Sequence, residues 1–378
     1  MRQYDANFGI GALVSVRSAL RVTYRVRSDA QSIEARAQTI AVEQSVEMPV
    51  EAIDDEAVKS DIVGRVIGIE DAGNGIFLVH IALAAETVGQ DAGQMINMLF
   101  GNTSIHDDVV LHDAEIPECL AAMFGGPRHG IHGMRERVAA GARALTCSAL
   151  KPQGLSPAAL ATLAYRLAQG GLDYIKDDHG FADQAYSSFA ARVEAIAMTL
   201  RQVGTRARYV PSLSGDLDAM RRQVGRARSA GLDTVMVTPM IMGFSNFNRL
   251  VRENPDMAFL AHPAMAGAAR IAPPLLLGKL FPLLGADAVA YPNHGGRFTY
   301  SPNTCRLIAQ AALDGPNGRK PALPVPAGGM TTARVNEMLD FYGADIMLLI
   351  GGGLLSARER LVEETAAFVG AVKDHRYT

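Results

Sequence analysis

The 378-residue chain is poor in cysteine, aromatic residues and net charge, and each shortage excludes a class of protein. Its three cysteines, Cys119, Cys147 and Cys305, are too few for a disulfide framework and are typical of a reducing compartment. A formal charge of −3 at pH 7 provides no basic field for nucleic acid or an anionic membrane. Tryptophan is absent and aromatic residues make up only 6%, yet hydrophobic residues reach 48% and charged residues 20%. This profile excludes collagen-like, disordered and disulfide-stapled proteins, and we expect no nucleic-acid or membrane partner.

The chain also lacks a long hydrophobic run. The longest apolar-rich stretch, residues 271–284, contains Lys279 and three prolines and is too short to span a bilayer. The first apolar run, residues 8–16, follows Asp5 and ends at Arg17, without the positive start and the length of a signal peptide. We therefore expect a cytoplasmic protein.

The first part of the sequence mixes strand and helix patterns. Residues 20–26, 63–69 and 76–82 have the composition of strands, whereas residues 34–41 and 89–99 have the spacing of helices. This predicts an α+β, ferredoxin-like N-terminal domain over residues 1–135, with an antiparallel sheet. The Gly/Pro-rich segment 125–130 has the composition of a linker.

After that point a short apolar strand, a turn and a helix recur about every 30 residues, which predicts a TIM (β/α)8 barrel over residues 136–378. Ser156 followed by Pro157 indicates a helix start, as does the capping-box pattern from Ser356 to Glu359. A doubly wound sheet has the same periodicity, but polar residues at the ends of many strands favour the barrel, which brings all those ends to one face. The eight expected strands are residues 144–150, 173–178, 207–212, 234–238, 257–262, 288–292, 322–326 and 346–350.

Two lysines and an aspartate at the ends of the first two barrel strands are the first candidate site residues. Side chains alternate along a strand, so Lys176 and Asp178 share one face of the second barrel strand. They form either a satisfied buried ion pair or a metal or acid/base site. Lys151, at the end of the first barrel strand, is compatible with a Schiff-base nucleophile, a phosphate clamp or a general base.

Glycines follow the last two barrel strands. Gly328 and Gly329 follow the seventh strand, and Gly351 and Gly352 follow the eighth, where TIM barrels often bind phosphate through backbone N–H groups. Ordinary loop glycines are the alternative. We expect His129 and His132 to be structural, and the polar cluster between His106 and Asp113 to be a solvated loop.

Several motifs together resemble the RuBisCO large-chain superfamily over nearly the whole chain. The most specific are residues 151–156 (KPQGLS) and 170–178 (GGLDYIKDD). Shorter matches are residues 41–45, 101–102, 126–131, 262–265, 327–329 and 351–353. Within the superfamily the chain is most similar to the RuBisCO-like proteins, which do not fix CO2.

The resemblance implies a role for each matching residue. Lys176 would react with CO2 to form a carbamate, and with Asp178 it would bind Mg²⁺, which prefers oxygen donors. Lys151 would move the proton at the enolised carbon, and His262 would act as an acid/base or orienting group. The resemblance also implies a homodimer with shared active sites, in which Glu43 and Asn102 reach the site of the other subunit and His294 contacts substrate.

Three departures from RuBisCO modify these expectations. His179 replaces a glutamate ligand, which removes an oxygen donor and favours a softer divalent metal. RuBisCO binds two phosphates, and the glycines of one phosphate site are present here as Gly329, Gly351 and Gly352. The positions of the other site are occupied by residues whose side chains cannot donate hydrogen bonds: Pro263, Ala290 and Ala327. Arg297 stands in place of a loop lysine and could grip a carboxylate, unless it is simply a surface residue.

Together these features predict a metal-stabilised enolate on a singly phosphorylated keto sugar or keto acid. Because Arg297 suits a substrate carboxylate, a decarboxylase of a 3-oxo sugar-acid phosphate is our first expectation. An enolase or isomerase of a diketo or methylthio-sugar phosphate is the main alternative. A metal-free Schiff-base barrel enzyme and a non-catalytic sugar-phosphate binder are the other two.

Overall fold

The computed structural model describes residues 19–377, so the apolar run at residues 8–16 lies outside the described residues. The chain divides into two compact units. One comprises the described residues up to Gly125 together with Met265–Leu276, and the other comprises Gly126–Ala264 and the described residues from Leu277 onward. Among the described residues, no helix is long and apolar enough to cross a membrane.

The first unit is an antiparallel sheet with strand order β2-β3-β1-β4, the ferredoxin-like arrangement that the sequence predicts. Alternate β1 residues from Leu20 to Val26 are buried, as are Ile33, Ala37 and Ile40 of α1. A two-residue turn at Asn74 and Gly75, both with positive φ, joins β2 to β3. Its elements are β1 (Ala19–Arg27), α1 (Ile33–Glu43), η1 (Val50–Ala52), α2 (Glu56–Asp61), β2 (Arg65–Gly73), β3 (Ile76–Ala84), η2 (Ala85–Val88), α3 (Ala92–Phe100), η3 (Asn102–Ile105), β4 (Val109–Glu115) and α4 (Glu118–Phe124).

The prediction of a solvated loop between His106 and Asp113 is correct for His106 and Asp107, which are exposed ahead of β4, and wrong for His112 and Asp113. Val109–Glu115 is the edge strand β4, which pairs with β1. Val109, Leu111 and Ala114 are buried, whereas the polar residues between them are not. One face of this strand is exposed to solvent, and its polar residues make the strand resemble a loop in the sequence.

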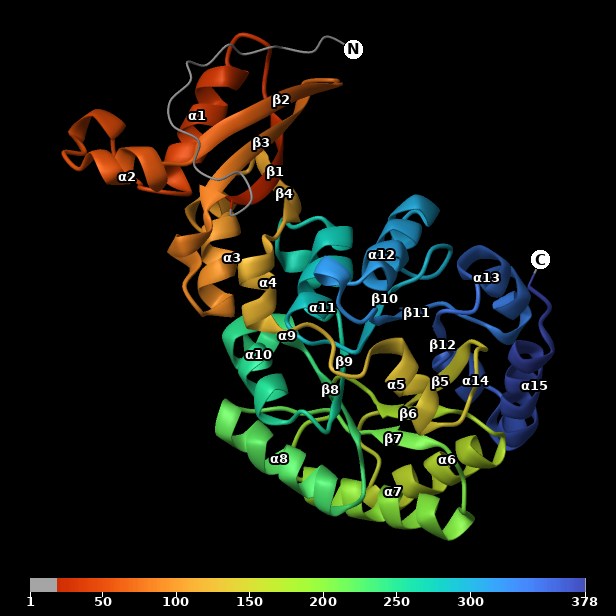
Figure 1. The fold of residues 1–378 in the computed structure, drawn as a ribbon. Helices are drawn as coiled ribbons and strands as arrows, with labels where there is room; N and C mark the ends of the chain where they lie inside the picture. The colour runs from red at the N-terminus through yellow and green to blue at the C-terminus, as the bar shows by residue number, and fades with distance from the viewer. Residues whose placement is uncertain (1–18, 378) are drawn as a thin grey trace. The chain divides into compact units, whose positions relative to one another are not determined.

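The second unit is a closed parallel barrel of eight strands, which confirms the predicted TIM barrel (Figure 1). Two four-stranded ladders have the orders β11-β10-β9-β8 and β12-β5-β6-β7. A parallel bridge between Ser212 and Met236 joins β7 to β8, and β11 lies against β12. The strands are β5 (Leu145–Leu150), β6 (Tyr174–Asp177), β7 (Arg208–Val210), β8 (Thr234–Val237), β9 (Ala258–Ala261), β10 (Ala288–Pro292), β11 (Leu323–Ala327) and β12 (Met347–Leu349).

The sequence indicates two capped helix starts in this unit, and the structure contains one of them. The Ser156 hydroxyl accepts the Ala159 N–H at the start of α6, as predicted. Ser356 does not cap a helix: its hydroxyl donates to the Gly353 carbonyl, and the next long helix begins only at Leu361. The helices are α5 (Gly130–Arg137), α6 (Pro157–Gln169), α7 (Phe189–Val203), α8 (Leu217–Ser229), α9 (Pro239–Met242), α10 (Phe244–Glu253), α11 (Phe281–Leu283), α12 (Pro302–Asp314), α13 (Val335–Tyr342), α14 (Gly352–Leu355) and α15 (Leu361–Asp374).

Helix α5 closes the N-terminal end of the barrel. Its residues Ile131 and Met134 belong to the same apolar cluster as the inward-facing strand residues. The Tyr174 hydroxyl, at the start of β6, donates to the Met134 carbonyl (2.8 Å). The Asp287 carboxylate accepts the N–H groups of His129 and Gly130 at the start of α5 (2.7 and 2.8 Å). The interior is therefore packed and closed at this end, and the polar residues of the barrel gather at the other.

Candidate active site

Strand β6 directs its last residues to opposite sides, as the alternation predicts. Lys176 is 4% exposed, and its amine donates to the Asp177 carbonyl (2.7 Å). Burial lowers the pKa of Lys176, against the opposing effects of the Cys147 thiol and the Asp178 carboxylate. The amine is therefore shifted toward its neutral form, which is the form that reacts with CO2.

Asp178 is the anionic centre of the site. One carboxylate oxygen contacts the Lys151 amine, and the other accepts from His179 Nδ1 (2.9 Å) and the Gly180 N–H (3.1 Å). Burial opposes ionisation, but the hydrogen bonds from His179, Lys151 and Gly180 hold the pKa of Asp178 well below its usual range. The carboxylate thus stays charged, and it joins the end of β5 to the end of β6.

His262, which follows β9, stacks on His179. The ring centroids are 4.4 Å apart and the planes are inclined by 6°. The Ala264 N–H donates to His262 Nδ1 (3.1 Å), so the ring proton lies on Nε2. Burial, together with the positive charges of Lys176 and His179, lowers the pKa of His262 to about 2. A neutral His262 can donate a hydrogen bond from Nε2 but carries no positive charge near neutral pH.

Five predicted residues therefore meet at the C-terminal end of the barrel. Lys176 lies in β6, and the other four directly follow a strand: Lys151 follows β5, Asp178 and His179 follow β6, and His262 follows β9. We call these five residues the mouth cluster. This end of a TIM barrel is where active sites are built.

The mouth cluster contains one carboxylate, which is too few for a metal site made of unmodified side chains. Among residues 19–377, no three His, Cys, Asp or Glu side chains are grouped closely enough to hold a metal. A carbamate on Lys176 would supply the missing anionic oxygen next to Asp178 and His179. The predicted ligand set fits a divalent metal in that modified form.

The glycines after β12 lie beside the mouth cluster. A Cβ atom on Gly351 would be 3.9 Å from Lys151 Cε, whereas one on Gly352 would have no heavy atom within 4 Å. The backbone here is open to an approaching group.

The glycines after β11 are packed closely against the loop that follows β10. Gly328 and Gly329 have φ values of +83° and +73°. A Cβ on Gly329 would lie only 2.4 Å from Gly296 Cα. Glycine is therefore required at position 329 by both the backbone angle and the close approach.

The structure does not bring Arg297 or His294 into contact with the mouth cluster through any interaction of the described residues. Arg297 is exposed, and its guanidinium lies 5.0 Å from the centre of the Phe298 ring. His294 packs against Phe341 (4.6 Å), and its carbonyl accepts from Arg334 (3.2 Å). Their predicted substrate contacts stay predictions.

Glu43 and Asn102 lie near one another within the first unit. Glu43 and Glu47 line a hollow of about 940 Å³ at the end of α1. The Asn102 amide donates to Glu47 (2.7 Å), and the Gln44 side chain accepts the Thr103 N–H (3.2 Å). The two predicted residues thus border the same surface.

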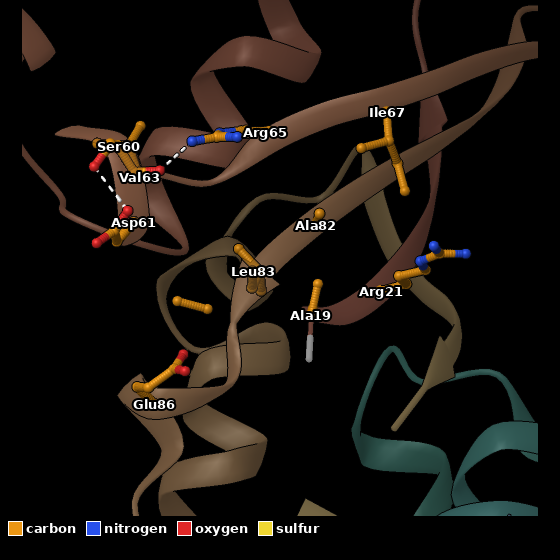
Figure 2. A pocket seen from close by; sticks show the side chains of 11 residues that line it. Ala19, Arg21, Ser60, Asp61, Val63, Arg65, Ile67, Ala82, Leu83 and Glu86 are labelled. Carbon is orange, nitrogen blue, oxygen red and sulfur yellow. Dashed lines mark hydrogen bonds between the residues drawn. The ribbon is translucent and has the colours of Figure 1, made fainter. Parts of the chain in front are cut away.

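A second hollow of the first unit, about 410 Å³, contains none of the predicted residues (Figure 2). Ala82 and Leu83 line it, and Arg21, Asp61 and Glu86 also border it. It has no arrangement of groups suited to enolate chemistry.

The partners of Asp177 were not predicted from the sequence. The carboxylate of this residue points away from the mouth cluster and binds Arg192 of α7 (3.0 Å) and the Tyr209 hydroxyl (2.7 Å). Asp177 is a charged residue at an outward position of an otherwise buried strand, and this feature of the sequence indicates that it needs a buried partner.

Comparisons with known proteins agree with this geometry. Residues 130–287 match the catalytic domain of the RuBisCO large chain. The chain is 60% identical to 5-methylthioribulose-1-phosphate isomerase from Rhodospirillum rubrum, over 93% of this chain and 96% of that protein. It is 29% identical to 2,3-diketo-5-methylthiopentyl-1-phosphate enolase from Geobacillus kaustophilus, over 94% and 92%. The crystal structure of a RuBisCO-like protein from Rhodopseudomonas palustris superposes with a TM-score of 0.89 at 50% identity, covering 96% of this chain and 99% of that one. The chain therefore belongs to the RuBisCO large-chain superfamily, among its non-carboxylating RuBisCO-like proteins.

Proposed function

We propose that this protein isomerises a singly phosphorylated methylthio-ketose of the 5-methylthioribulose 1-phosphate class by proton transfer through an enediolate. The observation that carries the proposal is the mouth cluster, in which an accessible lysine, a charged carboxylate and a neutral histidine converge. The activity for which the relative at 60% identity is named supports this substrate.

Lys151 is the group that we assign to proton transfer. Its side chain is 38% exposed, whereas Lys176 is buried, so Lys151 is the amine of the mouth cluster that can reach a substrate carbon. In the proposed reaction the Lys151 amine removes a proton from the carbon next to the carbonyl. Return of a proton at the other carbon of the enediolate completes the isomerisation, with no net gain or loss of atoms.

His262 is placed to stabilise the charge that develops on oxygen. Its Nε2–H can donate a hydrogen bond, and burial, which is the largest effect on its pKa, keeps the ring neutral. The histidine can therefore support the enediolate oxygen without supplying a competing positive charge.

We propose that a Lys176 carbamate, Asp178 and His179 would hold a divalent metal, Mg²⁺ being the expected ion. When bound, the metal would supply Lewis-acid stabilisation of the enediolate. The lowered pKa of Lys176 supports carbamate formation because it favours the neutral amine.

The site has different surroundings for the phosphate end and the uncharged end of the proposed substrate. We assign a single phosphate to the glycines after the last two strands, where Gly351 and Gly352 provide open backbone and Gly328 and Gly329 pack against the neighbouring loop. At the positions aligned with the second phosphate site of RuBisCO, Ala290 is buried and Ala327 packs against the barrel core. Neither side chain can bind a phosphate, which supports an uncharged group at that end of the substrate.

The decarboxylase that we expected first has less support. It depended on Arg297, whose guanidinium is exposed and stacked on Phe298. The relatives compared are named as an isomerase and an enolase. The Schiff-base alternative has less support for the same reason, since neither name describes Schiff-base chemistry.

The quaternary structure and location are also proposals. We propose a cytoplasmic homodimer in which Glu43 and Asn102 of one subunit complete the active site of the other. The location of both residues at one surface of the first unit supports a shared role.

Incubation with 5-methylthioribulose 1-phosphate in D2O tests the proposed function. We expect an isomeric ketose phosphate that carries deuterium, detected by NMR. Lys151→Met should lower kcat by between about 10²- and 10⁴-fold, since that is the usual contribution of a general base. Release of CO2 from a 3-oxo sugar-acid phosphate, without turnover of the methylthio-ketose, would instead establish the decarboxylase.

A further inference from the structure

A fully buried ion pair lies directly behind the mouth cluster. Arg192 Nε donates to an Asp177 carboxylate oxygen at 3.0 Å, and both side chains have no exposed surface. The Tyr209 hydroxyl and the Ser212 N–H complete the hydrogen bonding of this carboxylate (2.7 and 3.0 Å). Asp177 stands between Lys176 and Asp178 in the sequence, so its position fixes the backbone that carries both.

The same guanidinium also holds the loop that follows β6. Arg192 Nη1 donates to the carbonyls of Ala182 (3.1 Å) and Ser187 (2.9 Å). The guanidinium carbon lies 5.4 Å from the centre of the Phe181 ring and 5.7 Å from that of Phe189. One side chain of α7 thus anchors the strand end before Asp178 and His179 and the loop after them.

Stability alone does not account for such a pair. Removing two charges from water costs several kcal/mol per ion, and an apolar pair of similar volume is often equally or more stabilising. A planar guanidinium that binds one carboxylate and two carbonyls fixes those groups in a single geometry. We infer that Arg192 is a positioning residue, which holds Asp178 and His179 in the geometry needed for proton transfer. The kinetic part of this inference rests on the proposed function.

The chain provides a matched control at the other end of the same strand. Arg143 binds Asp173 through two hydrogen bonds of 2.7 Å, and Asp173 directly precedes β6. Asp173 is also buried and accepts from the Thr146 N–H and hydroxyl (both 2.9 Å). This pair also joins a guanidinium to a buried carboxylate, with the Arg143 side chain 20% exposed, but it lies at the end of the barrel away from the mouth cluster.

The test compares two double variants that remove both charges of a pair, so that no unpaired buried charge remains. These are Arg192→Met with Asp177→Asn, and Arg143→Met with Asp173→Asn. Hydrogen exchange of residues 178–188 is measured without substrate. The kcat and KM for the methylthio-ketose phosphate and the thermal midpoint are measured for both variants.

We expect the Arg192 variant to exchange its loop amides at least tenfold faster and to lose roughly 100-fold in kcat, with KM little changed. The Arg143 variant should lose thermal stability but keep its loop exchange and kcat within about threefold of wild type. Arg192→Lys, which keeps the charge but not the planar fork, should fold, exchange its loop faster and lose part of kcat. This single variant serves if the double variant does not fold.

The exchange measurement needs no turnover, so it separates this inference from the proposed substrate. Unchanged exchange of residues 178–188 in the Arg192 variants would overturn the positioning role, whatever the substrate. Equal losses of kcat in the two double variants, each proportional to the loss of thermal stability, would also overturn it. Faster loop exchange in an enzyme that does not turn over the methylthio-ketose would support the positioning role and refute the proposed function.

Discussion

The imidazole rings of His179 and His262 lie face to face, with centroids 4.4 Å apart and planes 6° from parallel. His179 Nδ1 is directed to Asp178 (2.9 Å), and His262 Nδ1 accepts the Ala264 N–H (3.1 Å). Each ring thus has one nitrogen committed to the protein and one free to face a ligand. The histidine that replaces a RuBisCO glutamate is therefore part of a stacked pair, in addition to its proposed contact with a metal.

Restoring the glutamate should exchange this pair for an additional metal ligand. His179→Glu places a second carboxylate next to Asp178, and Mg²⁺ affinity rises with the number of charged oxygen ligands. We expect Mg²⁺ to bind about tenfold more tightly, measured by calorimetry in bicarbonate buffer. The kcat for isomerisation should fall because His262 loses its stacking partner.

The matched control for this prediction is His179→Gln. It removes the ring without adding a charge, so kcat should fall while Mg²⁺ affinity stays the same or decreases. If His179→Glu binds Mg²⁺ no better than His179→Gln, position 179 does not face the metal.

An ion pair of the first unit predicts a pH-dependent contribution to stability. Arg36 binds the Asp108 carboxylate through two hydrogen bonds of 2.8 and 2.9 Å. The hydrogen bond from Arg36 lowers the pKa of Asp108 from its ordinary value of 3.8. Because the folded-state pKa is below the unfolded one, the contribution is present above about pH 4 and is lost as the pH falls through the folded-state pKa.

Asp108→Asn should therefore lower the free energy of unfolding by about 0.5–1 kcal/mol at pH 7, as for other partly exposed pairs. The difference from wild type should shrink in urea titrations below pH 4. Glu115→Gln is the control, since its 3.7 Å pair with Arg21 is largely exposed and should contribute little at any pH. A difference for Asp108→Asn that grows toward low pH would contradict the assignment.

The sequence predicted the structure best in strands that are buried on both faces. The barrel strands are buried on both faces over most of their length, so they occur mainly as apolar runs, and a lysine or aspartate among them is conspicuous. Lys176 and Asp178 were found in this way, and the alternation of strand side chains correctly placed them on one face. The edge strand β4 was missed because only one of its faces is buried.

Side-chain direction and long-range partners were not predictable in the same way. The position of Arg297 in the sequence indicates a loop near the barrel mouth, but it does not show that the guanidinium stacks on its neighbour Phe298. Arg192 occurs in a helical segment, where a charged residue usually faces solvent. Its complete burial depends on Asp177, whose direction is known only once the register of β6 is fixed.

Close packing between two loops makes Gly329 a specific probe of phosphate binding. A Cβ at this position would lie 2.4 Å from Gly296 Cα, so Gly329→Ala should separate the loops after β10 and β11. We expect KM for the phosphorylated substrate, and the Kd for inorganic phosphate, to rise by tenfold or more, as a misplaced binding group implies. The strained φ of +73° should also cost about 1–2 kcal/mol of stability.

Gly343→Ala provides the control for the strain. Gly343 has a similar φ of +80°, but a Cβ there would have no heavy atom within 4 Å. Its variant should also lose stability, because φ +80° with ψ −164° is a region that essentially only glycine adopts, while KM and phosphate affinity stay at wild-type values. Equal changes in the two variants would show that phosphate does not bind at the Gly329 loop.

The proposed sharing of active sites predicts complementation between two inactive subunits. Lys151 belongs to the barrel unit and Glu43 to the first unit, so a variant in each can be combined in one heterodimer. In a symmetric dimer with shared sites, pairing Lys151→Met with Glu43→Gln places both substitutions at one site and leaves the other intact. Heterodimers purified through two different affinity tags should then show about half of the wild-type kcat per dimer.

If each site is instead built from a single subunit, both sites of this heterodimer lack an essential group and the activity stays at the level of the separate variants. A heterodimer of Lys151→Met with wild type has one intact site under either arrangement, so it calibrates the half-activity expected for sharing.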